Sequence, residues 1–202
     1  MKSLTAIAFT LLLASCAIAP FNTATTARSL GKDKIEISGS ILPILGLKIE
    51  RGLTDRLDIG AGFELQADTL FFLHSKFAFI NNEKNGFSLA ALSGGSLASG
   101  YSRARSIFGG PLVSYRWETF ELFFGARFNY TQWNYFDFLR KDPGALDRLI
   151  ALPSTENHFT YWQFDPGMSF VGEQVMTGTG LHLLKYKDHL LGVPYLHFGF
   201  KF

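Results

Sequence analysis

The feature that most constrains the fold is an alternation with a period of two residues, which recurs in several segments of the chain. Between residues 57 and 65 every odd position is apolar, whereas the even positions are acidic residues or glycine. Residues 122–130 follow a similar rule, with Phe123 as the exception. Because successive side chains of a β-strand point to opposite faces, this period gathers the apolar residues on one face of each strand. The alternation therefore predicts strands with one apolar face.

Turn residues divide the chain into ten predicted strands. The even number places the first and last strand ends at the same edge, and the turns near 53–55, 81–85, 117–119 and 171–173 at that edge are all short. Eight strands are the alternative, because the hairpin around Pro43 and the Ser- and Gly-rich run 93–100 carry weak strand signals. The predicted strands are 33–41, 44–51, 56–66, 69–80, 86–98, 105–117, 120–133, 157–170, 174–185 and 189–202.

The polar face of these strands favours a membrane over water. That face is narrow and rich in glycine, with isolated charges, which suits a crowded lumen better than the outside of a soluble protein. After residue 16 no continuous apolar run reaches the about 18 residues of a membrane helix. We therefore predict an all-β fold, a transmembrane antiparallel up-and-down β-barrel whose Phe and Leu rows face lipid. The predicted lumen charge network consists of Asp58, Glu64, Arg127, His197 and Lys201.

The C-terminal residues support the same class. Leu196, Phe198, Phe200 and Phe202 alternate with polar residues, glycine and Tyr195, and an aromatic residue stands last. This pattern resembles the C-terminal signature of bacterial outer-membrane proteins, which the barrel-assembly machinery reads. Residues 51–60 also resemble the short periplasmic hairpins of many small barrels. The resemblance is to small bacterial outer-membrane β-barrels as a class, and it implies the outer membrane of a diderm bacterium without assigning functional residues.

The first residues predict export and a lipid anchor. Lys2 precedes an apolar run from residue 4 to 13 that is too short to span a bilayer, so residues 1–15 are interpreted as a signal peptide. The run ends in Leu-Ala-Ser-Cys, which resembles the lipobox of bacterial lipoproteins and implies lipid attachment at Cys16 by the lipoprotein-processing machinery. Cleavage after the Ala-Ile-Ala triplet at 17–19 is the alternative. Ala17 stands where an aspartate retains lipoproteins in the inner membrane, so outer-membrane delivery is expected. The even number of strands puts both termini on the periplasmic side, where the lipid anchor is expected.

Residues 16–32 lack any period and are interpreted as a lipidated tether, which leaves 33–202 for the barrel. The longest connection, 134–156, contains Asp142 followed by Pro143, which predicts a short helix on the extracellular side. This connection is a candidate contact for a surface partner. Interfacial aromatic girdles are predicted from Tyr115, Trp117, Tyr130, Trp133, Tyr161 and Trp162.

Composition and motifs exclude several functions. The net charge of +2 does not suit a nucleic-acid partner, and the single cysteine rules out an intramolecular disulfide. His74 and Ser75 are adjacent, so on a strand they point to opposite faces and cannot act as a base and nucleophile pair. His182 and His197 fall on inward positions, with Lys201 and Glu173 as expected neighbours. No catalytic residue, metal ligand or cofactor is predicted.

The leading functional hypothesis is a lipid-anchored barrel with a structural or surface-interaction role and a narrow, side-chain-filled lumen in contact with outer-membrane lipids. The alternatives are a small selective pore or lipid or small-ligand binder, a lipid-modifying enzyme, and a soluble periplasmic lipocalin-like lipoprotein.

Overall fold

The fold is built from ten antiparallel strands. The computed structural model describes residues 19–21, 23, 25–42, 44–66, 68–99, 104–132 and 158–202. The strands are β1 Ile35–Leu42, β2 Leu45–Gly52, β3 Leu57–Leu65, β4 Thr69–Ile80, β5 Gly86–Ser99, β6 Arg105–Trp117, β7 Phe120–Gln132, β8 His158–Val171, β9 Val175–Tyr186 and β10 His189–Lys201. No helix among these residues is both long and apolar enough to cross a membrane.

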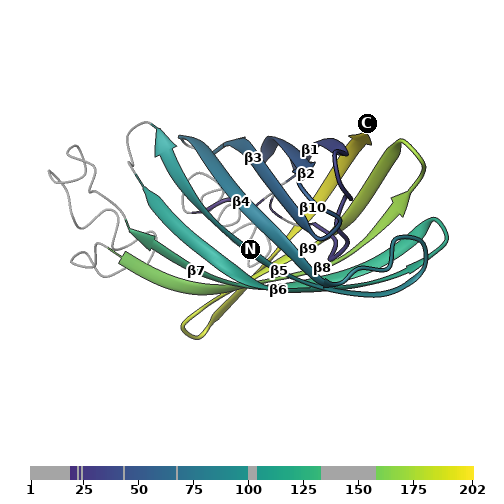
Figure 1. Cartoon of the computed structure of the whole chain (residues 1–202). Coiled ribbons are helices and arrows are strands. Elements are labelled where there is room, and N and C mark those ends of the chain that lie inside the picture. Colours follow the sequence, from purple (N-terminus) through teal and green to yellow (C-terminus); the bar gives the residue numbers. More distant parts are fainter. Residues whose placement is uncertain are drawn as a thin grey trace, which may run out of the picture.

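The sheet closes on itself into a barrel. Each strand pairs with its neighbour in the sequence, and β1 also pairs with β10, where Glu36 lies opposite Lys201. Backbone hydrogen bonds between Ile35 and Phe202 extend this seam to the last residue. Figure 1 shows the strands tilted across the barrel, with β1 beside β10. Closure leaves no unpaired edge, which is the condition for a sheet to stand in lipid.

The apolar side chains point outward and the polar ones inward. Exposed fractions reach 68% for Leu73 and 74% for Phe202, whereas Asp58 and Glu64 are fully buried in the lumen. This is the orientation predicted for a membrane barrel. It excludes the lipocalin-like alternative, in which the apolar rows would fill the interior.

The ten-strand prediction is confirmed, and every strand boundary lies within two residues of its predicted position. The strands on either side of Pro43, β1 and β2, pair with each other. Residues 93–99 of the Ser- and Gly-rich run lie in β5, which pairs with β4. The eight-strand alternative is therefore wrong. The helix predicted within 134–156 lies outside the described residues.

The two ends of the barrel differ in their connections. At the turn end, where β1 begins, the connections 53–56, 81–85, 118–119 and 172–174 are all short. The opposite loop end carries the long connection 133–157. Outer-membrane barrels have short periplasmic turns and longer extracellular loops, so the loop end corresponds to the cell surface.

Aromatic residues lie on the outer face near both ends. Tyr115 and Trp117 are exposed at the turn end with ring centroids 4.5 Å apart, and Tyr130 and Trp162 are exposed toward the loop end. The prediction that Tyr161 belongs to the aromatic girdle is wrong, because its side chain is buried on the lumen side of β8. Its position is odd-numbered on a strand whose even-numbered residues face lipid, so alternation places it inward.

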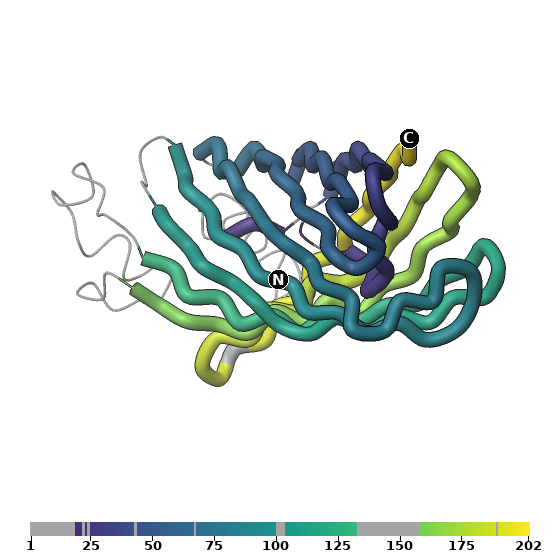
Figure 2. Tube along the Cα trace, viewed as in Figure 1, coloured from purple at the N-terminus to yellow at the C-terminus, as the bar shows by residue number. Residues whose placement is uncertain are grey.

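The described residues of the stretch 19–30, which we call the lumenal segment, lie inside the barrel. Its described residues are 19–21, 23 and 25–30, and Ala19, Phe21, Thr23, Ala27 and Arg28 are buried. Figure 2 shows the purple N-terminal trace surrounded by the strands. The interpretation of this stretch as a tether did not anticipate this placement, because nothing in its composition indicates packing inside the sheet.

Candidate functional site

The lumen is the candidate site, and all five residues of the predicted charge network lie in it. Asp58, Glu64 and Arg127 are buried, and His197 and Lys201 are partly buried. Their contacts include side chains that the sequence did not predict for this network, such as Lys76 beside Asp58 and Glu36 beside Lys201.

Ion pairs cover the lumen wall formed by β1 to β4. Lys76 Nζ lies 3.2 Å from Asp58 Oδ2, and Lys48 Nζ lies 2.6 Å from Glu50 Oε2. His74 Nε2 lies 3.0 Å from the other oxygen of Glu50. Because these side chains are almost fully buried, each charge depends on its partner for the solvation that water would otherwise supply. Each of the two buried lysines of this wall is therefore paired with a carboxylate.

The first residues of the lumenal segment are held at the loop end. The backbone N–H of Phe21 donates to Glu64 Oε2 over 3.0 Å, and Gln66 Nε2 donates to the Ala19 carbonyl over 3.2 Å. Arg127 donates to the Pro20 carbonyl and to Gln163. Backbone N–H and carbonyl groups of the segment thus form hydrogen bonds with side chains on β3, directly after β3 and on β7, as buried backbone groups require.

The last residues of the segment are held at the turn end. Arg28 Nε forms a buried ion pair of 3.0 Å with Glu121 Oε1, and its Nη2 donates to the Gly86 carbonyl over 2.7 Å. Ser29 Oγ donates to Asp58 Oδ1 over 2.7 Å, and the Leu30 N–H donates to Oδ2 of the same carboxylate over 3.1 Å. The segment therefore enters at the loop end and leaves at the turn end.

An apolar cluster supports the middle of the segment. Ala27 is fully buried against a group of inward-facing side chains from β4, β5 and β6. The cluster consists of Ala27, Ala78, Ala90, Leu92, Phe108 and Leu112.

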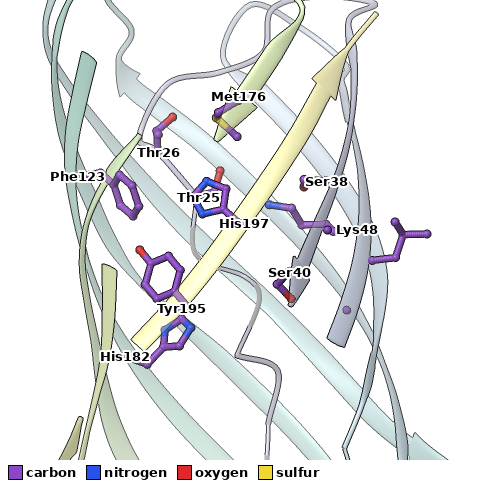
Figure 3. A pocket seen from close by; sticks show the side chains of 13 residues that line it. Thr25, Thr26, Ser38, Ser40, Lys48, Phe123, Met176, His182, Tyr195 and His197 are labelled. Carbon is purple, nitrogen blue, oxygen red and sulfur yellow. The ribbon is translucent and has the colours of Figure 1, made fainter. Parts of the chain in front are cut away.

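A second polar group lies on β8, β9 and β10. His182 Nδ1 is 2.6 Å from Asp165 Oδ1, which also accepts a hydrogen bond of 2.8 Å from Gln163 Nε2. The Tyr195 ring stacks on His182 on one side and on His197 on the other, as Figure 3 shows. The partner of His182 is thus Asp165 and not Glu173, because the β8–β9 register brings Asp165 to the same depth.

The cavity beside these rings has a volume of about 20 Å³ and is lined on one side by Thr25 and Thr26 of the lumenal segment (Figure 3). A single water needs about 10–15 Å³, so this space suits a water and not a substrate. Histidine and aspartate are paired here as in a catalytic relay, but among the described residues no hydroxyl or thiol forms a hydrogen bond with His182 Nε2. The arrangement is a hydrogen-bonded lumen wall.

His74 and Ser75 point to opposite faces, as predicted. His74 is buried beside Glu50, whereas Ser75 lies on the outer face with its Oγ 3.0 Å from Ser93 Oγ. Among the described residues, no three His, Cys, Asp or Glu side chains are placed to hold a metal ion together.

Sequence reasoning missed much of the lumen chemistry. The alternation marks every second strand residue as inward. It could therefore also have predicted the lumen residues Glu36, Lys48, Glu50, Lys76 and Glu121. It could not have predicted Arg28, because the lumenal segment has no period.

The C-terminal residues with the assembly pattern lie on the outer face of β10. Phe200 and Phe202 are exposed, Leu196 is 36% exposed and Phe198 is partly exposed. Cys16 lies outside the described residues.

No family model matches the chain. No curated protein matches it either. Among solved structures, the N-terminal β-barrel domain of Pseudomonas aeruginosa OprF matches 85% of this chain and 99% of its own, at 12% identity and a TM-score of 0.40. Ail, the attachment invasion locus protein of Yersinia pestis, matches 84% of this chain and 95% of its own, at 12% identity and a TM-score of 0.30.

A bacterial polysaccharide outer membrane secretin matches 79% of this chain and 55% of its own, at 9% identity and a TM-score of 0.45. These similarities are too low to carry a functional argument. The class follows from the closed sheet, the apolar outer face and the polar lumen. The chain is an outer-membrane β-barrel of ten strands whose lumen contains its own N-terminal segment.

Proposed function

We propose that this protein is a lipid-anchored outer-membrane barrel with a structural or surface-interaction role and a lumen that does not conduct. The observation that carries the proposal is the lumenal segment, which is hydrogen-bonded to the barrel wall near both ends. A barrel of eight to ten strands has an interior only just wide enough for side chains. A peptide packed into that interior supports a lumen without a continuous aqueous path. Surface contacts are assigned to the connection 134–156, which lies outside the described residues.

Purified full-length protein is expected to show no conductance steps in planar bilayers in 1 M KCl. At this ionic strength the Debye length is about 3 Å, so fixed charges are strongly screened. Folding is checked by heat-modifiable migration on gels, and detergent buffer alone is the control. Sustained, reproducible steps from folded protein would refute the closed lumen.

We infer the membrane side of the proposed anchor from the direction in which the lumenal segment passes through the barrel. Ala19 is bonded to Gln66, which directly follows β3 at the loop end. Three extended residues span at most about 11 Å, so Cys16 is expected near the loop end. The sequence analysis placed the anchor beside the strand termini at the periplasmic side. We propose instead that the acyl chains of Cys16 enter the leaflet at the cell surface.

Replacing Cys16 with alanine is expected to remove all incorporation of a clickable palmitate analogue, because the thiol and amine of that residue are the acceptors. Ala17→Ser is the matched control and should label normally. Labelling that persists in Cys16→Ala would overturn the anchor, and a wild-type protein that takes up no label would favour cleavage after Ala19. An epitope inserted after Ala17 should stain on intact cells, and staining only after permeabilisation would place the anchor on the periplasmic side.

A further inference from the structure

An apolar groove lies on the lipid-facing side of the barrel toward the loop end. Gly95 on β5 stands opposite Leu73 on β4 and Ile107 on β6, and all three line the groove. Leu73 and Ile107 are exposed, and because Gly95 has no side chain, a hollow remains between them. The groove has a volume of about 750 Å³. This volume lies within the about 300–1,000 Å³ of pockets that hold small molecules.

The groove ends at a cation without a protein partner. Arg105 on β6 stands opposite Gln132 on β7 in the last pair of these strands at the loop end, and both residues line the groove. The Arg105 guanidinium is exposed, and it forms no hydrogen bond or ion pair with any described residue. The planar fork of a guanidinium matches two oxygens of a phosphate. An apolar groove below such a group has the chemistry of a site for a phosphorylated lipid.

A second hollow lies on the other side of Tyr130, whose side chain lines both. Phe128 on β7 and Trp162 on β8 contribute apolar surface to it. Lys185 on β9 stands opposite Trp162 and is exposed beside this surface. The arrangement of an apolar hollow beside an exposed cation is thus present twice on neighbouring strands.

The exposed charges of the outer face at the loop end favour an anion. Counting Lys, Arg, Asp and Glu among the described residues, Arg105 and Lys185 have no acidic neighbour on this face. Lys187 and Asp188 are adjacent in the β9–β10 turn and offset each other, and Asp68 is buried. The loop end corresponds to the cell surface, so the lipid beside it belongs to the outer leaflet. Lipopolysaccharide of that leaflet carries a net negative headgroup, whereas phosphatidylethanolamine carries its own ammonium group and is neutral.

We infer that the outer face of β4 to β9 binds lipopolysaccharide at the loop end, with an acyl chain in the groove over Gly95 and a phosphate on Arg105. Lys185 lies on the far side of Tyr130 and serves a second phosphate. Because the groove already faces hydrocarbon, the acyl chain gains packing contacts and the cations supply the selectivity. The inference rests on the orientation of the barrel in the membrane and not on the closed lumen, so the two stand or fall separately.

Arg105→Glu is expected to weaken binding of purified lipopolysaccharide to the folded full-length protein by about tenfold or more, the effect of losing one hydrogen bond to a charged group. Native mass spectrometry in detergent measures the bound fraction. Arg51→Glu is the matched control, because Arg51 is exposed on the outer face at the turn end, and it should bind like the wild type. Equal affinities of Arg105→Glu and the wild type would overturn the inference.

Removing the phosphates from the ligand tests the same contact from the other side. Dephosphorylated lipopolysaccharide should bind the wild type about as weakly as the intact ligand binds Arg105→Glu. It should lose little further affinity in that variant, because the contact is already absent. Phosphatidylethanolamine that displaces lipopolysaccharide at equal concentration would show a general phospholipid site and contradict the assignment.

Gly95→Leu tests the acyl chain, because its side chain fills the groove, and it should lower the affinity several-fold. Gly192→Leu is the matched control on the outer face of β10, where it leaves the groove open. Heat-modifiable migration checks that each variant folds. A Cβ at Gly95 would lie 3.2 Å from the Ser106 carbonyl oxygen, so Ile107→Ala, which removes a wall without adding atoms, serves if Gly95→Leu does not fold. Unchanged binding by the folded groove variant would contradict an acyl chain at this place.

Discussion

Replacing Gly110 with valine is expected to abolish assembly of the barrel. A Cβ at this position would lie 1.9 Å from the backbone oxygen of Ala126 on β7. Pro111 follows directly and has no N–H, so the β6–β7 ladder is interrupted between Gly109 and Leu112. The backbones approach closely at this gap, and a clash with backbone cannot be relieved by rotating a side chain. The cost should exceed the about 1–3 kcal/mol typical of overpacking.

Heat-modifiable migration and recovery in the outer-membrane fraction measure this effect. Gly192→Ala is the control on β10, because its Cβ would meet only the flexible end of Leu183 at 3.4 Å, and it should assemble normally. Normal amounts of folded Gly110→Val would show that β6 and β7 can separate without loss of the barrel.

Lys76→Met is expected to destabilise the folded barrel by about 3–5 kcal/mol, the usual cost of removing one member of a buried ion pair. Lys76 Nζ lies 3.2 Å from Asp58 Oδ2 and donates to Thr25 Oγ1 over 3.4 Å. Both charged side chains are almost fully buried. Methionine keeps most of the aliphatic volume but leaves Asp58 without its cation. The urea midpoint of refolded protein in detergent should therefore fall.

The double variant Lys76→Met with Asp58→Asn should recover part of this loss, because no unpaired charge remains. Arg51→Met breaks an ion pair that is exposed on both sides, and such pairs contribute about 0–1 kcal/mol. Equal midpoints for Lys76→Met and the wild type would mean that water reaches Asp58 in the lumen.

The contacts of the lumen could not be predicted, although its residues could. Alternation marks Asp58 and Lys76 as inward on β3 and β4, and adjacency of these strands makes their pairing plausible. The pair His182 and Asp165 depends in addition on the β8–β9 register, and this register shifts the expected partner from Glu173 to Asp165. The period of apolar residues shows which side chains of a strand point inward, but it does not show which residues of two neighbouring strands lie opposite each other.

The strand bounds and the face that meets lipid could be predicted from the sequence, because a period of two residues is a local property of each strand. What fills the barrel could be seen only in the folded structure. The lumenal segment has no period, and its hydrogen bonds to the strands join residues 28 to 107 positions apart, such as Leu30 with Asp58 and Pro20 with Arg127. Such contacts exist only after closure brings β3 and β7 around the same peptide.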